Sequence, residues 1–274
     1  MNQCVPLGSI AIGICLAFAA TGCSDASTNS GSGGLAGSDL GQSGGAGRGA
    51  AGSNAAAGGS ERSPQCESSQ DPIDPTALID NLEDNDAQLV ATGQRNGLWW
   101  LSTDLSAGNI TPPGDQALQP ARILGGRCSS KYAMHVAGDG FSNWGAMMIV
   151  NFRYDGKLEP IDASNFHAMR FWARAGQANQ SQVRVQFQDG NTSPEGGVCN
   201  PTAGSADACY NGFGVSLTSL DTEWRAYRVE FDRMSQRAFG LRRDALDTTT
   251  LYSIDFVVPP NALFDVWVDD LWFE

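Results

Sequence analysis

Two groups of acidic residues stand at opposite ends of the part of the sequence that has a folded composition. One is the run 80–86 (Asp-Asn-Leu-Glu-Asp-Asn-Asp), and the other is the pair Asp269 and Asp270 near the C-terminus. Carboxylates held together repel one another unless a proton or a cation neutralises them, and oxygen ligands without His or Cys suit Ca²⁺. If the first and last strands of the domain are neighbours, the sequence predicts a structural calcium between them. The alternative is that both groups are separate turn-forming acids.

The segment around the second acidic pair predicts a strand with an irregularity. The apolar residues of FDVWV (264–268) alternate in one phase, whereas those of DDLWF (269–273) lie in the opposite phase. Side chains along a strand point alternately to two faces, so the apolar set returns to the core only if one extra residue is accommodated. We therefore expect a β-bulge at Asp269 and Asp270.

The chain from about Cys66 onward is typical of an all-β protein. Short alternating runs are separated by Gly, Asn, Asp and Pro, and the best helical pattern, 233–246, is interrupted by Gly240. We expect strands at 77–79, 132–136, 147–152, 169–173, 183–187, 213–217, 224–231, 254–258 and 264–268. Many short strands without intervening helices predict an antiparallel β-sandwich of the jelly-roll kind.

The N-terminus predicts export and lipidation. Residues 5–20 are uncharged and largely apolar, as in a secretory signal peptide, and Ala-Thr-Gly-Cys at 20–23 resembles a bacterial lipobox. We expect residues 1–22 to be a signal peptide, Cys23 to carry the lipid, and 23–65, rich in Gly, Ala and Ser, to be a flexible tether. The folded domain is then 66–274, held at the bacterial cell envelope, on the outer membrane or cell surface. The alternative is a plain cleaved signal with an incidental cysteine.

The charge balance argues against nucleic acid as a partner. The chain has 17 Lys and Arg against 30 Asp and Glu, a formal net charge of −13, and no basic run. Phosphate binding requires clustered cations, and an acidic chain is repelled by a polyanion. We expect membrane contact through the lipid anchor alone, and a monomeric domain.

The cysteines fit an oxidising compartment. Of seven, the first two leave with the signal, one is lipidated and four remain, which allows three disulfide connectivities. Cys199 and Cys209 are close together in a Gly- and Ser-rich loop, so we pair them and assign Cys66 to Cys128. Zinc is the competing interpretation, but the chain has only two His and no CxxC spacing.

Three stretches resemble a known family. They are "NLEDND" (81–86), "YAMHVAGDGFSNWGAMM" (132–148) and "FDVWVDDLWF" (264–273). They resemble carbohydrate-binding modules of the galactose-binding-like jelly-roll type, of family 11 and the related intermediate-associated-protein 30 domains, over about 76–274. The resemblance implies a non-catalytic module that binds a polysaccharide or oligosaccharide. It also implies a calcium between Glu83 and Asp270, with Asp86 and Asp269 as neighbours.

Sugar sites in such modules lie on the concave sheet face or in edge loops, and the sequence leaves both open. Sugar rings pack on aromatic rings, and their hydroxyls pair with Arg, Gln and Glu. Alternation places such side chains opposite the apolar ones on the predicted strands. For the concave face we expect Trp172, Arg170, Arg184, Gln186, Arg228, Glu230 and His135. For the edge loops the candidates are Trp99, Trp100 and Trp144. A merely solvated face and ordinary packing of the tryptophans are the alternatives.

Two other functions remain open from the sequence. The stretch Glu230-Phe-Asp232-Arg-Met234 resembles the Glu-x-Asp-x-x-Glu strand of family 16 glycoside hydrolases, but the last Glu is missing, since Met234 and Ser235 stand there. A glycan-active jelly-roll hydrolase or lyase is therefore the first alternative to a non-catalytic module. A structural or adhesion domain without a sugar site is the second.

Overall fold

The computed structural model describes residues 74–176, 182–202 and 204–274. The predicted signal peptide, Cys23 and the tether lie outside these ranges. Within them, no helix has the length and apolar character needed to cross a bilayer.

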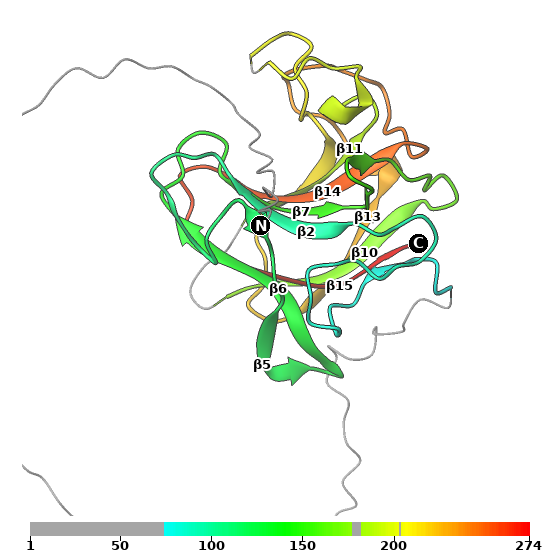
Figure 1. Cartoon of the computed structure of the whole chain (residues 1–274). Coiled ribbons are helices and arrows are strands. Elements are labelled where there is room, and N and C mark those ends of the chain that lie inside the picture. The colour runs from blue at the N-terminus through cyan, green and yellow to red at the C-terminus, as the bar shows by residue number, and fades with distance from the viewer. Residues whose placement is uncertain (1–73, 177–181, 203) are drawn as a thin grey trace, which may run out of the picture. The chain divides into compact units, whose positions relative to one another are not determined.

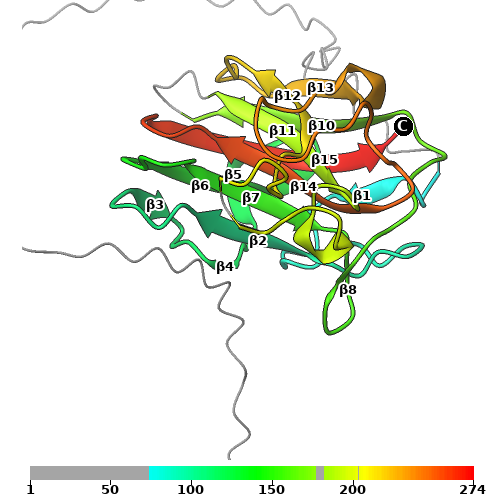
Figure 2. The same ribbon diagram turned by 90° about the horizontal axis from the view of Figure 1, so that it is seen from above.

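The strands form two antiparallel sheets that pack against each other (Figure 1). The seven-stranded sheet has the order β13 (Arg225–Glu230), β10 (Ala168–Ala175), β15 (Phe264–Phe273), β6 (Ser130–Asp139) and β3 (Asn109–Thr111), with β1 (Leu78–Asp80) beside β15 and β5 (Ala121–Arg127) beside β6. The six-stranded sheet has the order β12 (Phe213–Leu217), β11 (Val183–Asp189), β14 (Leu251–Val258), β7 (Ala146–Asn151), β2 (Leu98–Thr103) and β4 (Gln116–Ala117). A small hairpin, β8 (Arg153–Tyr154) and β9 (Leu158–Glu159), and two 3₁₀ turns, η2 (Pro194–Gly196) and η3 (Phe231–Arg233), complete the described elements. Figure 2 shows the long strands of both sheets from above.

The hydrophobic core lies between the two sheets. Met169 and Phe171 of β10 are fully buried, as are Val185 and Phe187 of β11, and all four belong to one cluster. The alternation of the sequence predicts these as inward residues, because successive side chains of a strand point to opposite faces. The predicted all-β antiparallel sandwich is confirmed. The weak helical pattern at 233–246 does not form an α-helix in this described segment, whose one helical turn is the end of η3.

The predicted bulge in β15 is confirmed. Asp269 lies opposite Trp172 of β10, while Trp272 lies opposite Arg170, so two residues of β15 face a single residue of β10. Asp270 adopts a positive φ of 43° at this point. The extra residue returns Leu271 to the core, as the change of apolar phase requires.

The first and last strands of the domain are neighbours, as the sequence predicts. β1 pairs antiparallel with β15, with Leu78 opposite Trp272. The acids that follow β1 therefore lie near the bulge that carries Asp269 and Asp270.

One of the two predicted disulfides lies within the described residues. Cys199 and Cys209 are bonded and close the long loop between β11 and β12. The other predicted pair, Cys66 and Cys128, includes a residue outside the described ranges.

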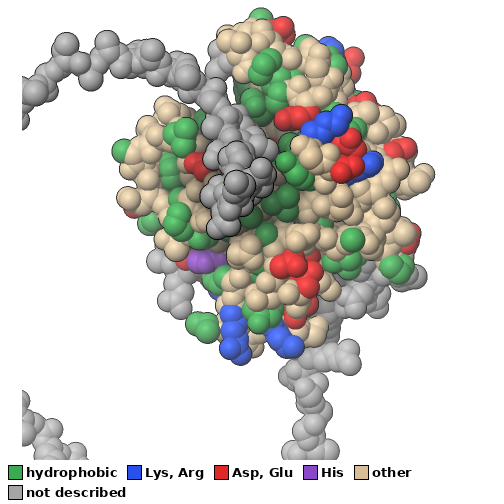
Figure 3. All heavy atoms as spheres, viewed as in Figure 1, with side chains coloured by type: hydrophobic (Ala, Val, Ile, Leu, Met, Phe, Trp, Pro, Cys, Tyr) green, Lys and Arg blue, Asp and Glu red, His purple; other side chains and the backbone are tan. Residues whose placement is uncertain are grey.

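Acidic side chains outnumber basic ones on the face of the molecule that Figure 3 shows. Figure 3 shows Asp and Glu side chains spread over the face in view, with fewer Lys and Arg among them. This agrees with the 30 acidic and 17 basic residues of the sequence.

Candidate functional site

The seven residues predicted to form one polar face belong to two different sheets. Five of them lie on the seven-stranded sheet: Arg170 and Trp172 on β10, Arg228 and Glu230 on β13, and His135 on β6. The other two, Arg184 and Gln186, lie on β11 of the six-stranded sheet. The prediction of a single face is wrong, because alternation separates the inner from the outer side of a strand but does not say to which sheet the strand belongs.

The charged residues on the seven-stranded sheet pair with one another. Arg170 donates its Nε to Glu274 Oε2 at 2.9 Å, and Arg228 donates to the same oxygen at 2.5 Å. Arg228 also donates to the carboxylate of Glu230. These side chains are partly exposed, and such pairs contribute little to stability. Their charges are already balanced before any ligand arrives.

Trp172 is buried in an outer cluster and does not form an open platform. Its exposed fraction is 2%, and it packs with Ile123, Trp224 and Trp272. The guanidinium of Arg127, at the end of β5, lies 4.6 Å from the centre of its ring. Ile123 and Arg127 of β5 thus cover this part of the sheet, and Trp172 is a packing residue.

His135 is likewise held by its neighbours. Its ring stacks on Trp267 with centroids 3.9 Å apart. Its Nε2 lies 2.9 Å from Asp265 Oδ1, to which Trp267 Nε1 also donates at 3.1 Å. Burial, the largest cause, lowers the pKa of His135.

Arg127 neutralises the two acids of the bulge. Its Nε donates to Asp269 Oδ2 at 2.9 Å, and its Nη2 donates to Asp270 Oδ2. The side chains of Arg127 and Asp269 are both buried. Burial, and then the charge of Asp270, raises the pKa of Asp269 to about 7 despite the opposing effect of Arg127.

Glu83 reaches the same place from the other end of the domain. Its Oε1 accepts the peptide N–H groups of Lys131 at 2.7 Å and Tyr132 at 3.2 Å. The Ser130 hydroxyl lies 3.1 Å from this oxygen and 2.7 Å from Asp269 Oδ2. Asp86 takes no part in these contacts and accepts the N–H of Gln88 at 2.7 Å.

The acidic side chains in this arrangement do not match the ligand set that the calcium predicted from the sequence requires. Calcium takes about six to eight oxygen ligands, whereas here Arg127 engages both aspartates and peptide N–H groups engage Glu83. In the described ranges, no three His, Cys, Asp or Glu side chains are placed to hold one metal ion. The calcium stays a prediction, and the cation placed between the acids is a guanidinium.

The outer face of the six-stranded sheet carries a second, different set of residues. The register of four strands places Trp100 (β2), Ile149 (β7), Asp255 (β14) and Gln186 (β11) in one row across the sheet. Trp100 and Ile149 are partly exposed. One half of the row, Trp100 and Ile149, is therefore apolar, and the other half, Asp255 and Gln186, is polar.

The polar half is built around the carboxylate of Asp255. Its Oδ2 accepts from Gln186 Nε2 at 3.1 Å and from Gln188 Nε2 at 2.8 Å, while Oδ1 accepts from Ser253 at 2.7 Å. Burial raises the pKa of Asp255. The Oε1 of Gln188 is buried and has no hydrogen-bond partner among the described residues. A buried acceptor without a donor is costly, and this oxygen is the unsatisfied atom of the network.

Two glycines of the neighbouring segment make room for these glutamines. A Cβ on Gly214 would lie 2.6 Å from the Cβ of Gln186, and one on Gly212 would lie 3.0 Å from Gln188 Nε2. The carbonyl oxygens of Val185 and Phe187 would lie closer still, at 2.3 and 2.5 Å, so both positions require glycine chiefly because the backbone of β11 is so near. Alternation predicts Gln188 on the same side of its strand as Gln186, but Gln188, Asp255 and these glycines were not among the predicted site residues. Gly-Phe-Gly at the start of a predicted strand was a visible signal.

The three tryptophans considered for edge loops have different positions. Trp99 is in the core and donates its Nε1 to Asp80 Oδ2 at 2.8 Å. Trp144 lies in a loop held by Asp104, which accepts its backbone N–H at 3.0 Å. Trp100 is on a strand, with its side chain on the outer face described above.

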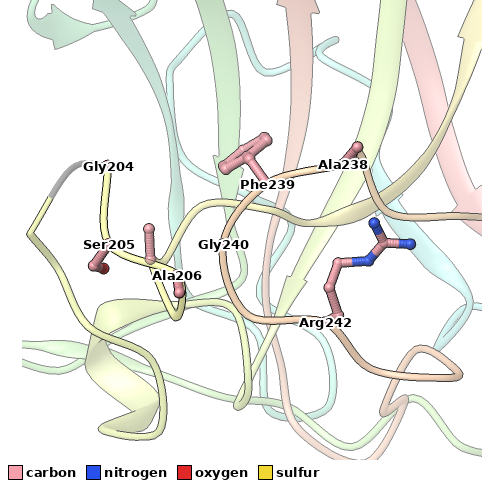
Figure 4. A pocket seen from close by; sticks show the side chains of 8 residues that line it. Gly204, Ser205, Ala206, Ala238, Phe239, Gly240 and Arg242 are labelled. Carbon is pink, nitrogen blue, oxygen red and sulfur yellow. The ribbon is translucent and has the colours of Figure 1, made fainter.

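A shallow hollow of about 370 Å³ lies beyond the six-stranded sheet, beside the disulfide loop. Figure 4 shows the segment that carries Ala238, Phe239 and Arg242 on one side and Ala206 on the other. Phe239 is 44% exposed.

No family model matches the chain, and no curated protein matches it either. The solved structures that match have low scores. A family 11 carbohydrate-binding module from Clostridium thermocellum, in complex with a β-1,3-1,4-mixed-linked tetrasaccharide, is 15% identical, with a TM-score of 0.45, over 72% of this chain and 94% of that one. A family 30 carbohydrate-binding module is 11% identical, with a TM-score of 0.47, over 72% and 87%. A family 29 module mutant complexed with cellulohexaose is 13% identical, with a TM-score of 0.36, over 71% and 86%.

These three chains are similar to this one in their general β architecture. Their scores are too low to carry a conclusion about its ligand or its site. The sandwich itself is established by the strand pairing described above.

Proposed function

We propose that this chain is a non-catalytic carbohydrate-binding module, and that the outer face of the six-stranded sheet binds the sugar. The observation that carries the proposal is the buried Oε1 of Gln188, which has no donor among the described residues. A sugar hydroxyl is a donor of the required kind. It would complete a network that already contains Asp255, Gln186 and Ser253.

The rest of the row fits a sugar ring. Trp100 and Ile149 offer a partly exposed apolar surface next to the polar network. A pyranose has an apolar face and a rim of hydroxyls, so it requires an aromatic surface and hydrogen-bonding groups side by side. The Asp255 network fixes the glutamines in place, so little side-chain freedom is lost on binding.

The residues that resemble a glycosidase motif support a non-catalytic function. Glu230 ends β13 and pairs with Arg228, while Asp232 lies in η3 with its side chain 81% exposed. The two acids are therefore not on one strand. Paired carboxylates flanking a bond are what glycoside hydrolysis requires.

We further propose that the module is displayed from the bacterial cell envelope by a lipid on Cys23. The support is the lipobox-like sequence at 20–23 and the Gly-, Ala- and Ser-rich tether at 23–65. Contact with the membrane would then be through the lipid alone.

A polysaccharide array with the full chain tests the sugar surface. The panel should contain neutral and acidic polymers, mixed-linked β-glucan among them. We expect binding to at least one polymer, and a loss of about tenfold in affinity for Gln188→Ala, because one buried hydrogen bond is removed. Arg170→Ala, which removes a polar side chain from the seven-stranded sheet, is the matched control and should bind as the unchanged chain does.

Three results would contradict the proposal. The first is a folded chain that binds nothing, which would favour a structural or adhesion domain. The second is Arg170→Ala losing binding while Gln188→Ala keeps it. The third is turnover of a polysaccharide that Glu230→Gln abolishes.

A further inference from the structure

Arg184 is a buried arginine that has no acidic partner in the part of the chain that the structure describes. Its Nε donates to Gln186 Oε1 at 3.2 Å, and its Nη2 donates to the carbonyls of Ser235 at 2.5 Å and Gly212 at 3.4 Å. These acceptors are neutral. Burial first, and then the positive charge of Arg237, lowers the pKa of Arg184 to about 10. The positive charge of Arg237 is therefore close enough to Arg184 to contribute to the lowering of its pKa.

Arg237 has no acidic partner either. Its side chain is exposed, and the hydrogen bonds of the Asn211 side chain reach only the backbone of Arg237. The guanidinium itself forms no ion pair or hydrogen bond with the described residues. Asp255, in the adjoining network, forms no ion pair with Arg237 or Arg184. In contrast, Arg170 and Arg225 on the seven-stranded sheet each pair with a carboxylate. Acids outnumber bases 30 to 17 in this protein, yet neither of these two arginines has an acidic partner among the described residues.

The surrounding segment strengthens this local positive charge. Residues 234–243 include three Arg and no Asp or Glu, and Asp244 follows them. The segment joins the edge of the six-stranded sheet, since Ser235 and Gly214 of β12 exchange backbone hydrogen bonds of 3.1 Å. Its Phe239 and Arg242 line the hollow shown in Figure 4. Cationic and aromatic side chains therefore continue the proposed sugar surface at this edge.

We propose that the ligand is an acidic polysaccharide, and that Arg184 and Arg237 bind the carboxylate of a uronic acid residue. This inference rests on the proposed function and adds the chemical class of the sugar. The planar guanidinium matches the two oxygens of a carboxylate, and a charge-assisted hydrogen bond is stronger than a neutral one. A carboxylate here would also relieve the repulsion between the two cations.

The test compares acidic polymers with their own neutral forms. The full chain is titrated with polygalacturonate, alginate and hyaluronate, each beside its carboxyl-reduced counterpart. We expect binding to at least one acidic polymer, at least tenfold weaker binding of its reduced form, and weaker binding of the acidic polymer in high salt.

Variants identify the residues responsible. Arg237→Ala should lose about tenfold in affinity for the acidic polymer, and Arg237→Lys should retain part of it, since the charge stays but the paired geometry is lost. Arg225→Ala removes the same charge from the seven-stranded sheet and should leave the affinity for the acidic polymer unchanged.

Equal affinity for the acidic and reduced forms would overturn the inference. An Arg237→Ala variant that binds the acidic polymer as tightly as the unchanged chain would also overturn it. If neutral polysaccharides bind and acidic ones do not, the inference fails while the proposed function stands. If no polysaccharide binds, both fail.

Discussion

The guanidinium of Arg127 lies between two carboxylates that follow it by more than a hundred positions: its Nε donates to Asp269 Oδ2 at 2.9 Å. The same group donates to Asp270 and lies over the ring of Trp172. One side chain thus neutralises the bulge of β15 and covers the outer cluster of the seven-stranded sheet.

We expect Arg127→Ala to destabilise the domain strongly. Removing one partner of a buried pair leaves a buried charge and costs about 3–5 kcal/mol. Arg170→Ala is the control, because its pair with Glu274 is partly exposed and worth about 0–1 kcal/mol. Urea unfolding of both variants measures the difference, and equal losses would contradict a special role for Arg127.

We expect a chelator to leave the melting temperature unchanged. Arg127 already places a positive charge beside both aspartates, so we expect the fold to hold without a metal ion. Differential scanning calorimetry of the full chain with and without EDTA measures this. A fall of several degrees on chelation, restored by added Ca²⁺, would instead establish the metal predicted from the sequence.

We expect the domain to be less stable at pH 8 than at pH 5. Burial, the largest cause, raises the pKa of Asp80 to about 7, above its ordinary 3.8. The folded state therefore holds a proton that the unfolded state releases, and this contribution is lost as the pH rises through about 7. Unfolding at both pH values measures the effect, and Asp80→Asn should reduce the difference. Stability that rises from pH 5 to pH 8, with Asp80→Asn having no effect on the slope, would contradict it.

We expect Trp172→Ala to cost stability. Trp172 is nearly fully buried and packs with Trp224 and Trp272, so its truncation leaves a cavity worth about 3–5 kcal/mol. Trp100→Ala should cost less, because Trp100 is partly exposed. Thermal unfolding of the two variants measures both, and a Trp172→Ala variant as stable as the unchanged chain would contradict the burial.

Local features were predictable from the sequence. The change of apolar phase at 264–273 located the bulge, because alternation is a property of neighbouring residues. The same reasoning found the inward residues of β10 and β11.

Apart from the pairing of the first and last strands, features that depend on distant residues were not predictable. The pairing of Arg127 with Asp269 joins separate strands, and no local pattern indicates it. Alternation placed Arg170 and Arg184 on outer sides but not on different sheets. Trp100 was considered a loop residue because Gly and Asn lie close to it in the sequence, but it belongs to β2, which pairs with β7.

The most direct test of the sugar surface uses the indole N–H signals of the seven tryptophans. The isotopically labelled full chain is titrated with the polysaccharide that it binds, and each signal is assigned by substitution. We predict that the Trp100 signal moves, while those of Trp172 and Trp267 on the seven-stranded sheet stay in place. Movement of the Trp267 signal with Trp100 unchanged would contradict binding on the six-stranded sheet.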